Sequence, residues 1–565
     1  MLTLTAPVRA IAAGMRRLTI GYRPLIESAI PEHAGMLSPD SIMTGSAVRE
    51  IHEKAFARAA ALAANPAVPE LHPWRFGETQ RTLFAAELGD VEEAAVFARE
   101  CAERENANNV VVISTSRRRA MEITRYLKEI DVRGIPLGLP DRDEERRADD
   151  ELVEATRFDR EELSPSPDVL VISESEAMGA MLRPVVAELR RRDECRIAYT
   201  HARRITPEPD SVRVARATAA NALASAVSAE SEVAGLDLVE QGLVRALQRR
   251  RLVETILACK EIERLLESSR PRLLVIGNDR VWTGQLLVQA AHRRGIPVLC
   301  VQDGLAADVP AWWLRTADHT ACNGTHLRDL LVRRGVPTDR LTVTGQPRND
   351  SLHARASELD TAAARSALGL ASSGLQLLVA LQGSHDEEYV RSVLREASRV
   401  PGATIILRTH PWQSPELVSS VVRQLELPNV LLRPDDDSAV AVRAADVVIS
   451  QYSTMLVEAA ALGTPAVAVT LSRRRNPIDL SDEGIAVPAR RRKEILPAIQ
   501  AALNRSPAET AAAQAAAERL IGPFDGGATA RVADLISELL ARSPADPGTA
   551  SGGEFARTAQ MPGHP

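Results

Sequence analysis

Two hydroxyl side chains and a carboxylate lie close together in the segment ADVVISQYSTMLVEAAALGTPAVAV, residues 445–469. The apolar run Val447–Ser450 predicts a buried strand, and a helix is expected to begin at Ser453 and Thr454. The first N–H groups of a helix have no partner within it, and the helix dipole is positive at that end. This turn therefore suits a phosphate group. Glu458 follows about one helical turn later, and we expect it to contact a ribose.

A histidine follows a second expected strand at the same edge of the sheet. The apolar run that ends at Arg408 predicts this strand, and Thr409, His410 and Pro411 come directly after it. Proline disfavours helical backbone for the residue before it, so His410 is expected in a turn. There its imidazole can donate a hydrogen bond to a phosphate or stabilise a leaving group. Taken alone, a histidine in this position is more often an ordinary turn residue.

Two loops of small and polar residues follow other expected strands. The loop GQPRND begins at Gly345, where the absence of a side chain permits close approach of the backbone to a ligand. Arg348 in this loop either pairs with a phosphate or holds two domains together, and the sequence leaves both open. Ser384 lies in the loop QGSHD and is expected to line the same cleft, on a weaker signal.

A carboxylate ends a strand of an earlier sheet. Asp303 follows the apolar run IPVLCVQ and precedes Gly304. A carboxylate at a strand end can act as a general base that takes a proton from an acceptor hydroxyl, although an Asp-Gly pair is more often a plain turn. The loop GNDR at 277–280 is expected to support Asp303, and the loop SESEAMG at 173–179 to let a sugar or an acceptor approach.

Three charged triplets have simpler explanations than a binding site. Asp435–Asp437 resembles a metal-binding group, but it precedes an expected helix and suits helix capping. Arg473–Arg475 and Arg490–Arg492 are expected in solvated loops, with contact to an anionic acceptor or to lipid headgroups as the alternative. No metal site is expected.

Composition excludes several classes of protein. The chain has 565 residues, enough for about three domains, and a net charge of −6 with 3% aromatic residues, which argues against nucleic-acid binding. The five scattered cysteines form no CxxC pair and are expected to be reduced thiols of a cytoplasmic protein. No stretch approaches about 18 apolar residues. Residues 1–23 are expected to form a surface helix, with a membrane-surface anchor as the alternative.

Apolar strands alternate with amphipathic helices along most of the chain, which predicts an α/β fold with two Rossmann-like, doubly wound parallel sheets that face each other across a cleft. Leu341–Thr344 is expected to begin the second sheet. The charged stretch 141–163 is expected to be a linker or a solvated helix. The expected units are an α-rich N-terminal extension with a strand–helix unit (1–163), an acceptor domain (164–315), a nucleotide-donor domain (316–542) and a disordered tail (543–565).

The two sheets and the turns at Asp303-Gly304, His410-Pro411 and Ser453-Thr454 together resemble GT-B glycosyltransferases. The chain is most similar to the bacterial sialyltransferase, Kdo-transferase and CDP-glycerol glycerophosphotransferase group, over residues 168–541. Two features depart from that group. Gln302 stands where sialyltransferases have a first acid, and the Trp-His-Gly turn of the glycerophosphotransferases is absent.

This resemblance implies a donor site at the second sheet. His410 would contact the donor phosphate and stabilise the departing nucleotide, Ser453 and Thr454 would bind the same phosphate, and Glu458 would hold the ribose. The substrates implied are a nucleotide sugar (CMP-, CDP- or UDP-linked) and a glycan or small-molecule acceptor, with no permanently bound cofactor. The expected donor-binding residues are Gly345, Arg348, Ser384, Arg408, Pro411, Gln451, Ser453, Thr454 and Glu458.

The sequence therefore predicts a metal-independent glycosyltransferase of surface polysaccharide or glycoconjugate biosynthesis, with Asp303 and His410 as catalytic residues. Three alternatives stay open. They are an enzyme of the UDP-N-acetylglucosamine 2-epimerase type, which shares this fold, a CDP-glycerol-type phosphotransferase and a non-catalytic binding protein. We also leave open a peripheral membrane contact, the oligomeric state and the donor sugar.

Overall fold

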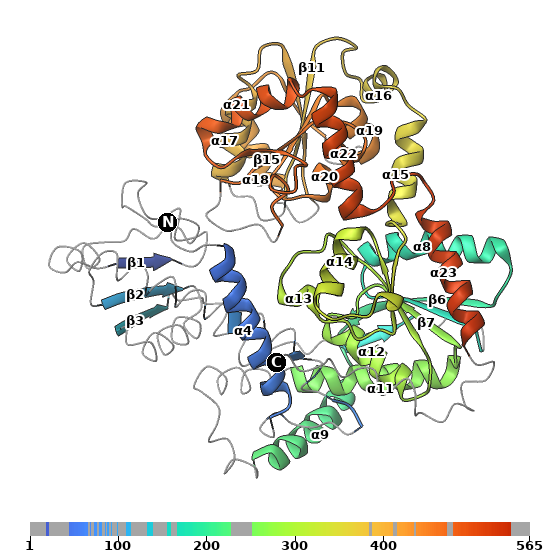
Figure 1. Ribbon diagram of the computed structural model, residues 1–565. Helices are drawn as coiled ribbons and strands as arrows, with labels where there is room; N and C mark the ends of the chain where they lie inside the picture. The colour runs from blue at the N-terminus through green and yellow to red at the C-terminus, as the bar shows by residue number, and fades with distance from the viewer. Residues whose placement is uncertain are drawn as a thin grey trace.

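A computed structural model gives the fold of the protein (Figure 1). The residues that it describes are 18–21, 45–65, scattered positions from 68 to 99, 109–114, 133–138, 155–159, 166–227, 251–382, 387–410, 415–433, 437–471 and 478–543. Ser384 and Pro411 lie outside the described residues, as do Asp435, Asp436 and the first arginine triplet.

The first large sheet has seven strands in the order β10-β9-β8-β7-β5-β6-β4. All neighbours are parallel except β4, which pairs antiparallel with β6 at one edge. The central strands are buried on both faces, as their continuous apolar sequences predict. The strands are β4 (Ala155–Phe158), β5 (Val169–Ser173), β6 (Ile197–Ile205), β7 (Leu273–Ile276), β8 (Val298–Val301), β9 (His319–Cys322) and β10 (Leu341–Val343).

Successive residues of these strands point to two different cores, as the alternation of side chains along a strand requires. Leu274 and Ile276 pack with one set of helices, whereas Val275 packs with another. The first set comprises α4 (Gly45–Ala63), α9 (Pro209–Val227), α11 (Arg251–Ser269) and α12 (Trp282–His292). The second comprises α8 (Glu176–Arg192) and α23 (Ala528–Arg542).

The second large sheet has six parallel strands in the order β13-β12-β11-β14-β15-β16. Its strands are β11 (Leu375–Ala380), β12 (Ala403–Arg408), β13 (Val430–Leu432), β14 (Val447–Ser450), β15 (Ala466–Val469) and β16 (Val487–Ala489). Helices α17 (Glu387–Ala397), α18 (Pro415–Leu425) and α21 (Arg492–Leu503) cover one face. Helices α16 (Thr361–Ala367), α19 (Ser438–Ala444), α20 (Thr454–Ala461) and α22 (Pro507–Ile521) cover the other. The expected fold of two doubly wound α/β domains is confirmed.

Three expectations about individual elements were wrong. The strand at Leu341–Thr344 belongs to the first sheet, where Leu341 pairs with Thr320. The stretch 141–163 contains strand β4, and residues 1–23 contain strand β1 (Leu18–Gly21). In each case the local pattern is too short to show its partner, and only the neighbouring strand decides the assignment. We propose that the boundary between the two large domains lies after Val343.

The N-terminal region contributes both a separate sheet and part of the first domain. Strands β1, β2 (Asn109–Ser114) and β3 (Arg133–Gly138) form a small parallel sheet at the side of α4 (Figure 1). Helix α4 itself packs on the core of the first domain through Ala55, Ala59 and Leu62. The expected strand at 109–114 is therefore confirmed, whereas the helix expected after it lies outside the described residues.

The chain crosses between the two large domains twice, and the two crossings touch. After β10 it passes through Gly345, and after α22 it returns through Gly522, where a Cβ atom would lie 2.7 Å from the Cα atom of Gly345. Both glycines have positive φ angles, 83° and 81°. Beyond the return, Asp350 accepts hydrogen bonds from the N–H groups of Ala528 (3.0 Å) and Thr529 (2.6 Å).

The last helix, α23, belongs to the second half of the chain but packs on the first domain. Val532 and Ile536 are fully buried against the first sheet, and Arg192 of α8 forms an ion pair of 2.6 Å with Asp534. None of the described helices is both long and apolar enough to cross a membrane.

We predict that Ile536→Ala destabilises the protein by roughly 2–5 kcal/mol, because it leaves a cavity under the first sheet. Glu538→Ala on the exposed face of the same helix is the control and should change stability by about 0.5 kcal/mol or less. Urea denaturation followed by circular dichroism measures both changes. Equal effects of the two substitutions would show that α23 does not anchor the first domain.

Candidate functional site

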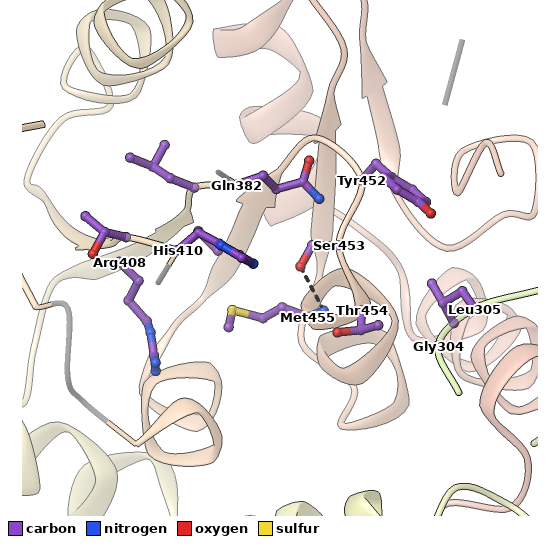
Figure 2. A pocket seen from close by; sticks show the side chains of 12 residues that line it. Gly304, Leu305, Gln382, Arg408, His410, Tyr452, Ser453, Thr454 and Met455 are labelled. Atoms are coloured by element: carbon purple, nitrogen blue, oxygen red, sulfur yellow. Dashed lines mark hydrogen bonds between the residues drawn. The ribbon is translucent and has the colours of Figure 1, made fainter. Parts of the chain in front are cut away.

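A cavity of about 420 Å³ lies between the two large domains, a size within the usual range of small-molecule sites. Its second-domain wall comes from the loops after β11, β12 and β14, and its first-domain wall from the turn after β8 (Figure 2). The lining residues are Gly304, Leu305, Ala380, Leu381, Gln382, Arg408, Thr409, His410, Tyr452, Ser453, Thr454 and Met455. Ligands of open α/β sheets bind at this carboxyl edge of the strands.

The N-terminus of α20 forms part of the second-domain wall of the cavity. Ser453 is the N-cap residue, with extended backbone, and its hydroxyl accepts a hydrogen bond from the N–H of Met455 at 3.2 Å. The helix thus begins where the sequence predicted. Because the cap satisfies one N–H, other N–H groups of the first turn and the positive end of the dipole stay available for an anion.

His410 and Arg408 enter the cavity from the end of β12. Figure 2 shows the imidazole of His410 pointing toward the hydroxyl of Ser453, whereas the side chain of Arg408 extends in another direction along the wall. A cationic or hydrogen-bonding side chain beside a helix N-terminus favours a negatively charged group. The structure therefore brings together four of the residues that the sequence singled out, namely Arg408, His410, Ser453 and Thr454.

Asp303 does not line the cavity itself but directly precedes Gly304, which does. Its carboxylate forms an ion pair with Arg280 and accepts a hydrogen bond from Nδ2 of Asn278 at 3.3 Å. Arg280 in turn lies over the indole of Trp312, with its guanidinium carbon 3.7 Å from the ring centroid. The loop 277–280 thus supports Asp303, as expected, through a charge and an amide.

The sequence analysis missed one carboxyl group, Glu174, which directly follows strand β5. Its Oε2 accepts a hydrogen bond from the N–H of Gly277 at 3.3 Å, and its buried Oε1 has no hydrogen-bond partner among the described residues. Burial raises the pKa of Glu174 to about 8; the Gly277 N–H opposes this shift, and the negative charge of Asp303 adds to it. An acid directly after a fully buried strand of mostly apolar residues was the signal that could have identified it.

The β5, β7 and β8 strands are neighbours in the sheet, so their terminal loops place Glu174, Gly277 and Asp303 at one edge. Two carboxyl groups in this small region have different environments. Glu174 has a buried oxygen and forms no ion pair with any described residue, whereas Asp303 is paired with an arginine. Such a difference allows two neighbouring carboxyl groups to take different roles in proton transfer.

Arg348 and Glu458 contact each other instead of the cavity. Nη2 of Arg348, at the start of α15 (Arg348–Ser357), donates to Oε1 of Glu458 in α20 at 3.1 Å. Both residues follow the proposed boundary at Val343, so this ion pair joins two segments of the second domain, and neither role expected for Arg348, the phosphate contact or the link between domains, is shown. The carboxylate of Glu458 is paired with this arginine, and its expected contact with a ribose stays a prediction.

The other residues predicted for the site lie at its margin or beyond the described residues. Gly345 packs at the domain crossing, and Gln451 precedes the cavity residue Tyr452 without lining it. Among the charged triplets, Asp437 caps α19, as expected, by accepting from the N–H of Ala439 at 2.8 Å. Arg490 pairs with Asp479 at 2.8 Å.

In the described part of the chain, no three His, Cys, Asp or Glu side chains gather closely enough to hold a metal ion. Four cysteines are described there, and all are free thiols: Cys195, Cys259, Cys300 and Cys322.

Two α/β domains with parallel sheets and a cavity between their carboxyl edges define a GT-B-type protein. A family model described as UDP-N-acetylglucosamine 2-epimerase matches residues 246–537, just over half of the chain. The protein belongs to this family. The match includes both walls of the cavity and both crossings between the domains, but it excludes Glu174 and helix α4.

Solved structures with a similar arrangement have low sequence identity. The UDP-GlcNAc 2-epimerase of Neisseria meningitidis, solved with UDP-GlcNAc, is 17% identical, with a TM-score of 0.44 over 66% of this chain and 100% of that one. The Methanocaldococcus jannaschii enzyme, solved with UDP-GlcNAc and UDP, is 13% identical, with a TM-score of 0.41 over 66% and 99%. The wall teichoic acid polymerase TagF is 13% identical, with a TM-score of 0.40 over 68% and 91%. No curated protein matches the sequence.

The raised pKa of Glu174 predicts a pH dependence of stability. Between pH 4.5, the ordinary value, and about pH 8 the folded protein keeps a proton that the unfolded chain loses, so stability falls as pH rises. Glu174→Gln cannot lose that proton. Its stability relative to the parent protein should therefore rise over this window, by at most about 1.4 kcal/mol per pH unit, as measured by urea denaturation at pH 5, 6.5 and 8.

Glu176→Gln provides the control for this measurement, because it makes the same change on an exposed side chain two residues away. The expectation is contradicted if Glu174→Gln and Glu176→Gln show the same pH trend relative to the parent protein.

Proposed function

We propose that the protein is an enzyme that acts on a UDP-linked N-acetylhexosamine and inverts the configuration at carbon 2 of the sugar. The observation that carries this proposal is the cavity itself, which joins an anion-binding helix end of one domain to the Asp303 turn of the other. The family match, which includes both walls, supports the same class of substrate.

The second domain offers the groups that a nucleotide diphosphate requires. The N-terminus of α20, the imidazole of His410 and the guanidinium of Arg408 lie along one wall, and each favours negative charge. When the bond between the sugar and the phosphate breaks, the charge on the departing diphosphate increases. Groups positioned at that oxygen stabilise the transition state more than the bound substrate.

Inversion at carbon 2 can proceed by elimination and re-addition. A base removes the proton from carbon 2, the bond from carbon 1 to the phosphate oxygen breaks, and a double bond forms between the two carbons. A proton then returns to carbon 2 from the opposite face, and the diphosphate oxygen attacks carbon 1 again. Atoms and charge balance, because the nucleotide diphosphate that leaves is the one that returns.

The first domain supplies two groups suited to these proton transfers. Asp303, paired with Arg280, provides a carboxyl group next to the cavity, and Glu174 provides a carboxyl group that keeps its proton at neutral pH. We propose that Asp303 acts on the sugar and that Glu174 lies behind it as the proton-holding partner.

A second candidate is transfer of the sugar to an acceptor hydroxyl, which the turn at α20 favours. Tyr452, Ser453 and Thr454 form a turn with three hydroxyls and no glycine. This pattern resembles the Y-S-S turn of teichoic-acid polymerases, whereas the epimerases usually carry a glycine-rich turn there. In this function Asp303 would deprotonate the acceptor.

The two functions are separated by incubating the protein with UDP-N-acetylglucosamine in D₂O without an acceptor and following carbon 2 by NMR. We expect the 2-epimer to appear with deuterium at carbon 2, since the returning proton comes from solvent-exchanged groups. Intact substrate without exchange, together with UDP release only when a glycan acceptor is added, would establish transfer instead.

Asp303→Asn should reduce the rate of epimerisation by about 10²–10⁴-fold, because the amide cannot take up a proton. Asp329→Asn, which changes an exposed side chain of the same domain, is the matched control and should retain the parent rate. Undiminished turnover of Asp303→Asn would remove Asp303 from the proton transfers.

Nucleotide binding is tested separately from the reaction. His410→Ala should weaken the binding of UDP by roughly 10- to 100-fold, because a hydrogen bond to a charged group is lost. Ser453→Ala should weaken it less, through loss of the cap that orders the helix end. Isothermal titration calorimetry at fixed ionic strength measures both.

Ser506→Ala is the control for the serine substitution, because Ser506 caps α22 in the same manner and does not line the cavity. An unchanged UDP affinity in His410→Ala would exclude His410 from the phosphate site.

A further inference from the structure

We propose that helix α4, which lies outside the family match, positions the catalytic side of the cavity by supporting residues 305–313, here called the wedge. The wedge holds Trp312 against Arg280, and Arg280 holds Asp303. The inference rests on the proposed function in one respect, that Asp303 acts on the sugar. α4, Trp312 and Arg280 are positioning elements and are not expected to touch the substrate.

The wedge begins in the cavity and lies between the two domains. Leu305 lines the cavity, and Leu305 and Ala307 pack in the core of the second domain, with Trp312 partly buried against it. Ala306 and Trp313 pack in the opposite direction, with helix α14 (Thr325–Arg333) of the first domain. The wedge therefore contacts both domains, and its first residue contributes to the first-domain wall of the cavity.

The wedge has little regular structure of its own. Its helix, α13 (Pro310–Trp313), is four residues long, and its N-cap residue Val309 makes no capping hydrogen bond with its side chain. Helices this short are not stable in isolation, so the wedge depends on the side chains that pack on it.

Helix α4 supplies several of these contacts from one face. The ring of Phe56 meets the ring of Trp313 edge to face, with centroids 5.5 Å apart. Glu53 forms an ion pair of 2.8 Å with Arg334, whose guanidinium carbon lies 3.8 Å from the centroid of Trp313. Phe56 and the guanidinium of Arg334 thus both pack against the Trp313 ring.

Asp308, a residue of the wedge, contacts Trp313, Arg334 and helix α4. It accepts from Nε1 of Trp313 at 2.8 Å and from Nη2 of Arg334 at 3.0 Å, and Arg49 of α4 lies 3.7 Å from its carboxylate. Because Glu53 also holds Arg334, α4 fixes both ends of the short helix.

Trp312 connects the wedge to Asp303 through Arg280. Its indole packs on the guanidinium of Arg280, and Arg315 lies on the same ring at 5.6 Å. The side chain of Arg280 is 13% exposed, and its partners are the Trp312 ring and the carboxylate of Asp303. If Trp312 moves, Arg280 loses the surface that fixes its orientation toward Asp303.

If α4 only stabilised the first domain, a substitution in its core-facing side chains would affect the wedge as much as a substitution of Phe56. α4 also packs on the large core of that domain through Leu62, which is 1% exposed and lies well over one turn beyond Phe56. Leu62→Ala therefore leaves a cavity in that core under another part of the same helix and removes no contact to Trp313. It is the matched control for Phe56→Ala.

Hydrogen–deuterium exchange of the full-length protein tests the proposal without reference to any reaction. In Phe56→Ala, amides of residues 302–314 should exchange at least five-fold faster than in the parent protein, whereas Leu62→Ala should leave them within two-fold. Phe56→Tyr retains the ring and should behave as the parent. Unchanged exchange in Phe56→Ala, or an equal increase in Leu62→Ala, overturns the proposal.

Kinetics give the second readout. Phe56→Ala should lower kcat for epimerisation about ten-fold and leave the UDP affinity within two-fold, since the nucleotide side of the cavity is not disturbed. Trp312→Ala, which leaves α4 intact, should do the same, and Trp312→Phe should restore part of the rate. A loss of UDP affinity that matches the loss of rate would indicate general destabilisation and contradict the proposal.

The two proposals fail in different ways. If the parent protein epimerises no nucleotide sugar, the proposed function fails, while the exchange comparison of Phe56→Ala and Leu62→Ala still decides the role of α4. If epimerisation is found and the exchange rates of residues 302–314 do not respond to Phe56→Ala, only the role of α4 is rejected.

Discussion

The close contact of two chain crossings at Gly345 and Gly522 is the constraint on which the cavity depends. A side chain at residue 522 would place its Cβ 2.0 Å from the carbonyl oxygen of Asn323, so the two crossings can meet only where both lack side chains. Arg531 of α23 stabilises the contact between the crossings, because its Nε donates a hydrogen bond of 2.6 Å to the carbonyl oxygen of Thr344. The two chain connections between the domains therefore run side by side, and the strand ends of both sheets face each other beside them.

This arrangement divides the chemistry between the domains. Helix N–H groups and the side chains of Arg408 and His410 make the second-domain wall suitable for an anion. Carboxyl groups gather on the other side, where burial keeps the proton on Glu174 and an arginine accompanies Asp303. A nucleotide sugar has the matching polarity, with a charged diphosphate at one end and a sugar at the other. The wedge lies between the two walls and contacts the cores of both domains.

Much of the fold was predictable because parallel strands buried on both faces have a strong local pattern. The runs at Val169–Ser173, Leu375–Ala380 and Val447–Ser450 each contain a single polar residue among apolar ones and appear as strands where expected. The start of α20 was equally clear, since a serine before an apolar helical run is a strong capping signal. By contrast, β4 and β10 are edge strands of three or four residues, whose sequence does not show which sheet they join.

The sequence by itself determined the strand ends and the residue types found there, because hydrophobic runs, caps and turns are local properties. It thereby identified Asp303, His410 and Ser453 as residues at the carboxyl edges of two sheets. Only the tertiary structure decided which of these side chains meet. It placed His410 with Ser453, engaged Glu458 with Arg348, and buried one oxygen of Glu174. Burial and ion pairing depend on segments more than 100 residues apart in the chain, and no local pattern in the sequence contains that information.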